Sequence, residues 1–351
     1  MLEGLILSVD AMGGDSAPEI VVEGIEYFLK HAGQRKNARF LLHGDETLLT
    51  PLLDKYKKAK ECSEICHTDK NVEMDTKPSV ALRRGRGTSM WNTIASVKNE
   101  EALVAVSAGN TGALMAMSKL QLRMQEGVGR PAIAARWPHE NGFGVVLDVG
   151  ANLECNAIQL REFAVLGEAY YRALYKKEKP SIGLLNVGTE ELKGNAIIQA
   201  AHDSLSCSKL GLNYIGFVEG YDISMGEVDV IVTDGFTGNI ALKTAEGAAR
   251  LLAKFIKTAL QGNIWSRMAS IINLPALRRM KERMDPRAFN GGVFLGLNGL
   301  VIKSHGGADA VGYAHALAVA INMADSHFLN ECADTLSALH EEDDDIEISL
   351  H

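Results

Sequence analysis

The chain has 351 residues, of which 46% are hydrophobic and 23% are charged, and its formal net charge is −8 at pH 7. This length and composition are typical of a soluble globular protein that buries a large core. The negative charge argues against nucleic acid as a partner, because a protein that neutralises phosphates needs a positive surface. The sequence has no apolar stretch of about 18 residues, which excludes a membrane-spanning helix.

The cysteine pattern argues against a disulfide framework and against a metal site. The cysteines are odd in number, and their spacings match no disulfide-rich scaffold. Cys62 and Cys66 are close in sequence, but no second pair with nearby histidines completes a zinc site. No signal-peptide pattern precedes the first apolar run, so we expect free thiols, no metal and a cytoplasmic location.

Short apolar runs, each stopped by Gly, Asp or Asn, alternate with helical patterns along the chain. The predicted pairs of one strand and one helix, in chain order, are Leu5–Val9 with Glu19–His31, Arg39–Leu42 with Glu46–Lys57, Ala102–Val106 with Gly112–Gln125, Gly144–Leu147 with Ala157–Tyr175, Ile182–Leu185 with Ala196–Cys207, and Val228–Val232 with Ile240–Leu260. This alternation predicts an α/β fold of three α/β/α layers, with a mainly parallel sheet covered by helices on both faces.

The loops that follow five of the predicted strands are rich in Gly, Asp, Asn, Ser and Thr, and they are 10–15, 107–112, 148–152, 186–194 and 234–239. Ligands of open parallel sheets bind beyond the carboxyl ends of the strands. We therefore expect these loops to form one shared cleft at one edge of the sheet. Small residues before a helix let backbone N–H groups approach an anion, which favours a phosphorylated ligand. For the 107–112 loop alone, the alternative is an ordinary helix cap by Asn110 or Thr111.

The common nucleotide-binding and nucleophile motifs are absent from these loops. There is no G-x-x-x-x-G-K-[ST], no G-x-G-x-x-G after the first strand and no G-x-S-x-G. Cys155 has no histidine near it in sequence, and His305, in a glycine-rich loop, fits a helix-cap region better than a catalytic base. We therefore expect a reaction that uses neither a cofactor nor a protein nucleophile.

Acyl transfer from a thioester to inorganic phosphate fits such a cleft, because phosphate supplies the attacking oxygen and a thiol with a pKa of about 8.5 leaves as its thiolate. The protein has to hold two reactants together and stabilise the oxyanion on the thioester carbonyl. Lys193 and Asn239 are the candidate donors for this task. The alternatives are that Lys193 is a solvated loop lysine and that Asn239 caps the following helix.

Seven ordered segments resemble the PlsX family, the phosphate acyltransferases of bacterial phospholipid synthesis. They are DAMGGDSAP (10–18), VSAGNTGAL (106–114), GRPAIA (129–134), LDVGAN (147–152), LLNVGTEELKGN (184–195), DVIVTDGFTGNIALKTAEG (229–247) and SHGGADA (304–310). The resemblance implies conversion of acyl-[acyl-carrier protein] and inorganic phosphate to acyl phosphate and free carrier protein. It also implies a homodimer and a fold similar to phosphotransacetylases and isopropylmalate dehydrogenases.

The resemblance identifies Lys193 and Asn239 as the catalytic pair. The residues expected to bind substrate or phosphate in the matching segments are Asp10, Gly13, Gly14, Asp15, Ser107, Asn110, Thr111, Asp148, Asn152, Glu190, Asp234 and Gly238. Two other functions stay open. One is a phosphotransacetylase-type enzyme that uses acyl-coenzyme A, and the other is a non-catalytic scaffold for lipid-synthesis enzymes at a membrane.

We expect a single catalytic domain over residues 1–330 and a disordered acidic tail over residues 331–351, because like charges gather near the chain end. Within the domain, residues 250–285 are expected to form a basic amphipathic helical projection. Its basic residues are Arg250, Lys254, Lys257, Arg267, Arg278, Arg279, Lys281 and Arg283, and its apolar residues include Trp265, Ile271, Ile272, Leu274 and Leu277. Such a stretch is typical of a helix that contacts a membrane surface or a partner. The possible partners are acyl carrier protein, a membrane or a membrane glycerol-phosphate acyltransferase, and the second subunit of a dimer.

Overall fold

A computed structural model describes residues 4–31, 37–262, 273–283, 285, 287, 290–326 and 328–349. Its centre is an 11-stranded sheet with the strand order β3-β2-β1-β4-β11-β10-β5-β6-β9-β7-β8. The strands are β1 (Leu5–Asp10), β2 (Ala38–Gly44), β3 (Ser63–His67), β4 (Val104–Ser107), β5 (Ala132–His139), β6 (Gly142–Leu147), β7 (Ser181–Leu185), β8 (Asn213–Val218), β9 (Val230–Val232), β10 (Gly292–Leu295) and β11 (Leu300–Lys303).

The helices connect and cover these strands. They are α1 (Glu19–His31), α2 (Glu46–Leu53), α3 (Lys57–Cys62), α4 (Pro78–Arg84), α5 (Ser89–Lys98), α6 (Thr111–Leu122), α7 (Ala157–Tyr175), α8 (Ala196–Cys207), α9 (Asp222–Met225), α10 (Gly235–Gln261), α12 (Leu274–Arg283), α13 (Ala310–Ala324) and α14 (Phe328–Ser349). Helices α1, α7 and α8 begin and end where the sequence predicts. The helix predicted near 46–57 ends at Leu53 as α2, a separate helix α3 begins at Lys57, and α10 begins before the predicted Ile240.

Alternating strand residues pack on opposite faces of the sheet, as the two-residue period of a strand requires. In β11, Leu300 and Ile302 belong to one buried hydrophobic cluster, whereas Val301 belongs to the other. Helices α1, α7, α13 and α14 supply residues to the first cluster, and α5 and α6 supply residues to the second. The predicted three-layer α/β/α fold with a mainly parallel sheet is confirmed.

The prediction that all five polar loops lie at one edge of the sheet is wrong. Strand β10 is antiparallel to both β11 and β5, and β5 is antiparallel to β6. Strands β1, β4 and β11 therefore run opposite to β6, β7 and β9. Neighbouring strands are rotated by about 20–25° relative to one another, so the five steps from β1 to β6 turn the sheet by about 100–125°. This twist turns the two groups of strand ends partly back toward each other.

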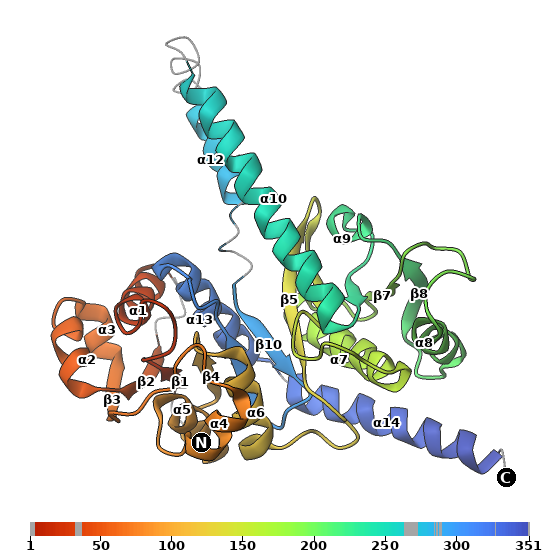
Figure 1. The fold of residues 1–351 in the computed structure, drawn as a ribbon, viewed down its shortest axis with the longest axis horizontal. Coiled ribbons are helices and arrows are strands. Elements are labelled where there is room, and N and C mark those ends of the chain that lie inside the picture. Colours follow the sequence, from red (N-terminus) through yellow and green to blue (C-terminus); the bar gives the residue numbers. More distant parts are fainter. Residues whose placement is uncertain are drawn as a thin grey trace.

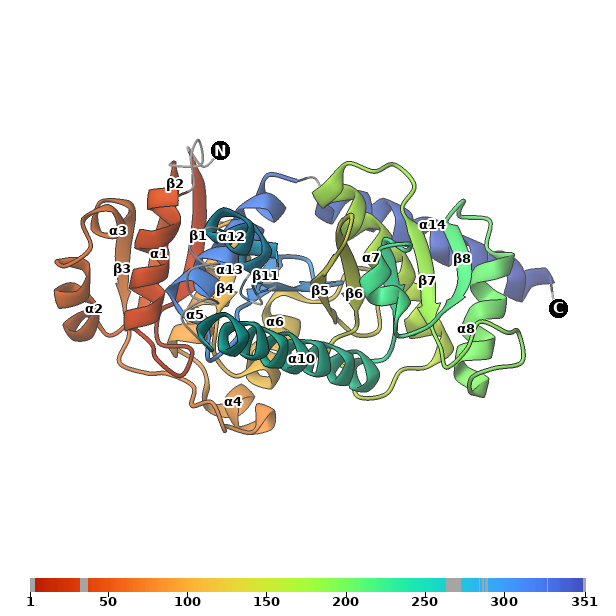
Figure 2. The same cartoon turned by 90° about the horizontal axis from the view of Figure 1, so that it is seen from above.

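Helices α10 and α12 extend away from the sheet (Figure 1). In the view of Figure 2, α10 runs along the molecule from the half with β7 and β8 toward the half with β1 and β2. The predicted basic projection therefore includes these two helices. Trp265, Arg267, Ile271 and Ile272 lie outside the described residues, as do the side chains of Arg278, Arg279, Lys281 and Arg283.

The predicted disordered tail is instead helical, because α14 continues to Ser349. Cys332, Leu336 and Leu339 are buried. Their spacing places them on one face of the helix, and this face packs against α7. At the start of α14, the ring of Phe328 meets that of Tyr170 edge-on at 6.2 Å between centroids. The prediction of disorder rested on the acidic charges of this segment and not on its apolar face.

In the part of the chain that the structure describes, no helix is both long enough and apolar enough to cross a membrane.

Candidate active site

The carboxyl ends of β1, β4 and β11 bring Asp10, Ser107 and Lys303 together, because these strands are parallel neighbours. Ser107 donates from Oγ to Oδ2 of Asp10 at 2.7 Å and accepts a hydrogen bond from the Gly109 amide at 3.0 Å. Burial raises the pKa of Asp10, although hydrogen bonds from Ser89 and Ser107 oppose this effect. Asp10 and Ser107, both predicted as binding residues, are thus hydrogen-bonded to each other.

Lys303 is a candidate that the sequence analysis missed. Its Nζ donates to the backbone oxygen of Ala108 at 3.2 Å and to that of Ser304, so it joins the loops after β4 and β11. Burial lowers the pKa of Lys303 to about 8, although the carboxylates of Asp10 and Asp15 oppose the shift. A partly buried cation among glycine-rich loops is suited to an anionic ligand. Its place directly before SHGGADA was the available sequence signal.

The loop after β1 contains Gly13, Gly14 and Asp15, and it touches the loops after β4 and β11. A Cβ at Gly13 would lie 2.7 Å from the Gly109 amide nitrogen, so no side chain fits there. The Asp15 amide donates to the Gly306 oxygen at 2.9 Å, whereas the Asp15 side chain is exposed. A small recess between these loops is lined by Gly13, Gly14, Ala108, His305 and Gly306, together with residues of α1 and α13.

Asn110 caps α6, as the alternative interpretation of the 107–112 loop stated. Its Oδ1 accepts from the Ala113 amide at 2.9 Å, and its Nδ2 donates to the backbone oxygens of Met74 and Thr76 at 2.7 and 2.9 Å. Both polar atoms of this side chain therefore serve the fold. Thr111, the first residue of α6, lies at the amino end of the helix.

The loop after β6 is organised around Asp148. Its Oδ1 accepts from the amides of Ile133, Gly150 and Ala151 at 3.0–3.1 Å, and its Oδ2 accepts from both nitrogens of Asn152 at 2.6 and 2.9 Å. Burial raises the pKa of Asp148, and these hydrogen bonds oppose the shift. Asp148 and Asn152, both predicted to bind substrate, thus shape the loop.

Asn239 lies on α10 directly above this loop. Asp234 caps α10 by accepting from the Thr237 amide at 2.8 Å, so the alternative that Asn239 caps the helix is wrong. The Gly235 amide donates to the backbone oxygen of Asn152 at 2.8 Å, and a Cβ at Gly238 would collide with the backbone oxygen of Asp148. This close packing lets Asn239 donate from Nδ2 to the Val149 oxygen at 3.1 Å.

Glu190 and Lys193 lie in the loop after β7, and both side chains are exposed. A Cβ at Gly188 would come within 2.5 Å of Glu190 Oε2 and 3.2 Å of Lys193 Cγ, so both side chains lie over this glycine. Strand β9 pairs with β7 on one side and with β6 on the other, all three in parallel. The loops of Lys193 and Asn239 therefore leave the sheet at neighbouring strand ends.

Helix α10 links the two groups of loops. Its first turn contacts the loop after β6, and one turn beyond Asn239 lies Lys243, on the same helix face. Burial lowers the pKa of His305, and the charge of Lys243 lowers it further; the charge of Lys243 also lowers the pKa of Lys303. The charge of Lys243 thus influences the loop after β11, and α10 runs from the half of the molecule with β7 and β8 toward the half with β1 and β2 (Figure 2).

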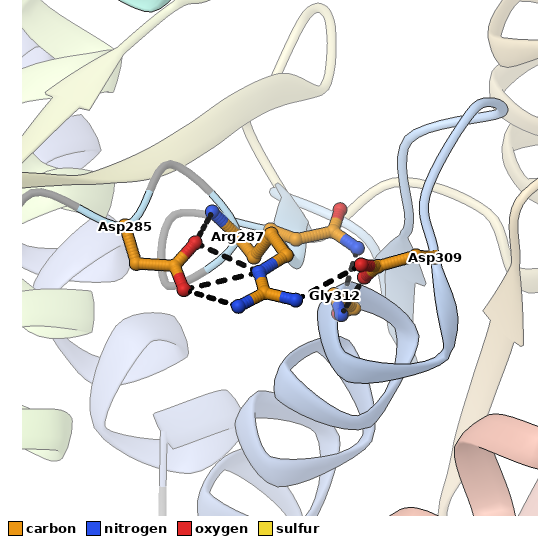
Figure 3. A network of polar contacts seen from close by, with 5 residues as sticks. Asp285, Arg287, Asp309 and Gly312 are labelled. Carbon is orange, nitrogen blue, oxygen red and sulfur yellow. Dashed lines mark hydrogen bonds and ion pairs between the residues drawn. The ribbon is translucent and has the colours of Figure 1, made fainter. Parts of the chain in front are cut away.

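A polar network anchors the other side of the loop after β11. Arg287 donates from Nε and Nη2 to Asp285 at 2.6–3.0 Å and from Nη1 to Asp309 Oδ2 at 2.9 Å (Figure 3). Asp309 caps α13 by accepting from the Gly312 amide at 2.8 Å. The segment that returns from the projection is therefore tied to the start of α13, next to His305.

The thiol at Cys155 is not an activated nucleophile. The residue is buried, and burial raises its pKa to about 12, so it is protonated at neutral pH. Across the residues that the structure describes, no three His, Cys, Asp or Glu side chains gather where they could hold a metal ion.

Comparison with known proteins places these observations in a family. Residues 5–331 match the family model described as "Fatty acid synthesis protein". The chain is 57% identical over 324 residues to a phosphate acyltransferase of Maricaulis maris, covering 92% of each chain. It is 51% identical to a phosphate acyltransferase of Caulobacter vibrioides, covering 97% of this chain and 93% of that protein.

Solved structures share the fold. A phosphotransacetylase from Streptococcus pyogenes superposes with a TM-score of 0.62 at 18% identity, covering 92% of this chain and 95% of that chain. The EutD phosphotransacetylase from Staphylococcus aureus gives a TM-score of 0.59 at 15% identity, covering 92% and 94% of the two chains. The predicted likeness to the phosphotransacetylase fold is confirmed.

Proposed function

The chain belongs to the PlsX family of phosphate acyltransferases, enzymes of fatty acid and phospholipid synthesis, and from this premise we propose that its acyl donor is acyl-[acyl-carrier protein] and that phosphate attacks the thioester directly. An oxygen of hydrogen phosphate forms a bond to the thioester carbon, and the carbon–sulfur bond breaks. The phosphate proton passes to the departing thiolate. The products are acyl phosphate and the free thiol of the carrier protein.

In this mechanism the side chains of Asn239 and Lys193 act on the reacting thioester. Asn239 donates to the oxyanion that develops on the thioester carbonyl, and Lys193 supplies positive charge to the oxyanion or the phosphate. The observation that carries this assignment is the fixed position of Asn239, held over the loop after β6 by its bond to Val149. A preorganised donor stabilises a developing charge without reorganising at the moment of reaction.

The reaction also needs phosphate held beside the thioester. Lys303 and Lys243 provide positive charge near the loops after β1, β4 and β11, and a small recess lies among the glycines of these loops. Asp10, Ser107 and the glycines of these loops shape that end of the site rather than reacting.

A single assay tests the proposal: release of carrier-protein thiol from acyl-[acyl-carrier protein] should depend on added phosphate. A higher kcat/KM with acyl-coenzyme A than with the carrier-protein thioester would favour the phosphotransacetylase-type alternative. The absence of turnover with both donors would favour the scaffold alternative. Trapping of a covalent acyl-enzyme would contradict direct attack, since that mechanism forms no protein-bound intermediate.

The proposed partners follow from the same family. We propose that the protein is a homodimer of the cytoplasm and that the projection of α10 and α12 contacts an anionic partner, either acyl carrier protein or the membrane surface. Exposed Leu251, Leu252 and Phe255 alternate with exposed Lys254 and Lys257 on α10, which supports an amphipathic contact. Lys254→Glu/Lys257→Glu should weaken binding to anionic vesicles or carrier protein, and wild-type binding should fall as salt rises. If the variant binds both partners as tightly as wild type does, the projection is instead a contact between the two subunits of the dimer.

A further inference from the structure

Along the first turns of α10, the side chains on one face of the helix change from apolar to charged. Phe236, Asn239, Ile240 and Lys243 follow the i, i+3, i+4, i+7 spacing that places residues on one helix face. Phe236 and Ile240 are apolar yet 58% and 50% exposed. Lys243 donates from Nζ to Glu246 Oε2 at 3.0 Å, and its charge lowers the pKa values of His305 and Lys303. The face therefore runs from an apolar end, past the Asn239 amide, to a cationic end.

Exposed apolar residues also lie on the loops that leave the neighbouring parallel strands β6 and β7. The Gly235 amide donates to the backbone oxygen of Asn152, so Phe236 and Leu153 each directly follow a residue of this contact. Leu153 is 73% exposed. Val187 and Leu192, in the loop that carries Lys193, are 81% and 96% exposed. We refer to Leu153, Val187, Leu192, Phe236 and Ile240 as the apolar rim.

From this arrangement we propose that the apolar rim binds the hydrocarbon chain of the acyl donor, with the thioester at Asn239 and phosphate at the Lys243 end. The inference rests on the proposed function and adds to it the residues that select the acyl chain and the direction in which the donor lies. The reaction joins an apolar chain to a phosphate through one carbonyl carbon. The α10 face presents an apolar surface, a hydrogen-bond donor and a cation in the same order.

The position of the rim favours the acyl chain over other apolar occupants. The rim includes the residue before Lys193 and the residue after Asn239, so whatever covers it also borders the two proposed catalytic side chains. A second copy of the chain seated on it would cover those side chains too. A hydrocarbon chain covers it only while its own carbonyl is at the reaction centre.

The test compares two donors that share one carrier. Wild type and the double variant Phe236→Gln/Ile240→Gln are assayed with butyryl- and palmitoyl-[acyl-carrier protein]. Each buried methylene is worth roughly fourfold in binding. The variant should therefore lose about tenfold or more in kcat/KM for palmitoyl donor and less than about twofold for butyryl donor. Glutamine keeps good helix propensity, so α10 should remain folded.

A matched control is Leu120→Gln, because Leu120 is also exposed, at 48%, on another helix, α6. This control should leave the ratio of the two kcat/KM values unchanged. An unchanged ratio in the double variant would overturn the inference while leaving the proposed function intact. A change from dimer to monomer in the double variant, measured by sedimentation, together with an equal loss for both donors, would overturn it in favour of a subunit contact.

A binding measurement tests the inference separately from the proposed function. If no donor is turned over, only the proposed function is contradicted, and the binding of alkyl phosphates still tests the apolar rim. Dodecyl phosphate should bind wild type more tightly than butyl phosphate by calorimetry, and the double variant should lose about tenfold of that preference. Equal preference in wild type and the variant would overturn the inference.

Discussion

The side-chain amide of Asn239 rests on Gly150. It donates to the backbone oxygen of Val149 at 3.1 Å, and a Cβ at Gly150 would lie only 2.8 Å from its nitrogen. Gly150 also has a φ of +134°, a conformation that residues with side chains rarely adopt. The loop after β6 therefore sets where this proposed oxyanion donor points.

The first prediction tests this contact. Gly150→Ala should lower kcat by about tenfold to a hundredfold, because the new methyl group displaces the Asn239 amide, and should destabilise the fold by about 1–3 kcal/mol. Gly142→Ala is the matched control, since Gly142 has a φ of +138° and its nearest neighbouring atom would lie at 4.0 Å. It should be destabilised similarly in a urea titration but keep its kcat. Equal kcat in both variants would contradict the proposed role of Asn239.

Lys193→Ala and Asn239→Ala should each lower kcat by about a hundredfold to a thousandfold, as expected when one donor to an oxyanion is removed. The Lys193 side chain is exposed, so its removal should leave the melting temperature within about 1–2 °C of wild type. Lys57→Ala removes another exposed lysine, 89% accessible, and should keep full activity. Wild-type rates in a folded Lys193→Ala protein would disprove the assignment.

The charge of Lys303 should make phosphate binding depend on pH. Its pKa, lowered by burial to about 8, means that the ammonium is charged below pH 8 and neutral above it. The KM for phosphate should therefore rise as the pH increases through about 8. Lys303→Arg keeps the charge at all these pH values, so this rise should disappear in the variant. The same rise in both proteins would show that another group titrates.

Arg287→Ala should lower the free energy of unfolding by about 1–2 kcal/mol at pH 7, because it breaks charge-assisted bonds to Asp285 and Asp309. Arg287 lowers the pKa of Asp285, so this stabilisation is present above the ordinary carboxyl pKa and is lost as the pH falls below it. The difference from wild type in urea titrations should thus shrink below about pH 4. Lys60→Ala, which breaks an exposed pair with Asp54, should cost less than about 1 kcal/mol. A pH-independent difference for Arg287→Ala would contradict the electrostatic origin.

Leu336→Ala should destabilise the protein by about 2–5 kcal/mol, because Leu336 is 1% exposed on the face of α14 that packs on the core. Asp334→Ala changes an exposed residue on the same helix and should have little effect. Thermal unfolding followed by circular dichroism separates the two outcomes. Similar melting temperatures would indicate that α14 contributes little to the fold.

The sequence by itself determined the elements whose signals are local. Helices α1, α7 and α8 were predicted close to their observed bounds, since their hydrophobic pattern has the helical period. The polar loops after the strands were also predicted from residue types, and Lys193 and Asn239 within them remain the proposed catalytic pair. The start of α10 was missed because glycines at 235 and 238 resemble a loop, whereas in the structure they allow the helix to pack on Asp148 and Asn152.

The tertiary structure alone decided how these parts meet. The direction of each half of the sheet depends on the antiparallel pairing of β10 and β5, and these pairs join segments more than a hundred residues apart, so no local pattern encodes them. The burial of Lys303 depends on the loop after β4. The helical state of residues beyond 330 depends on α7, which gives the apolar side of an acidic segment a surface to cover. Local periodicity fixes which residues share a face, but only long-range contacts fix what that face touches.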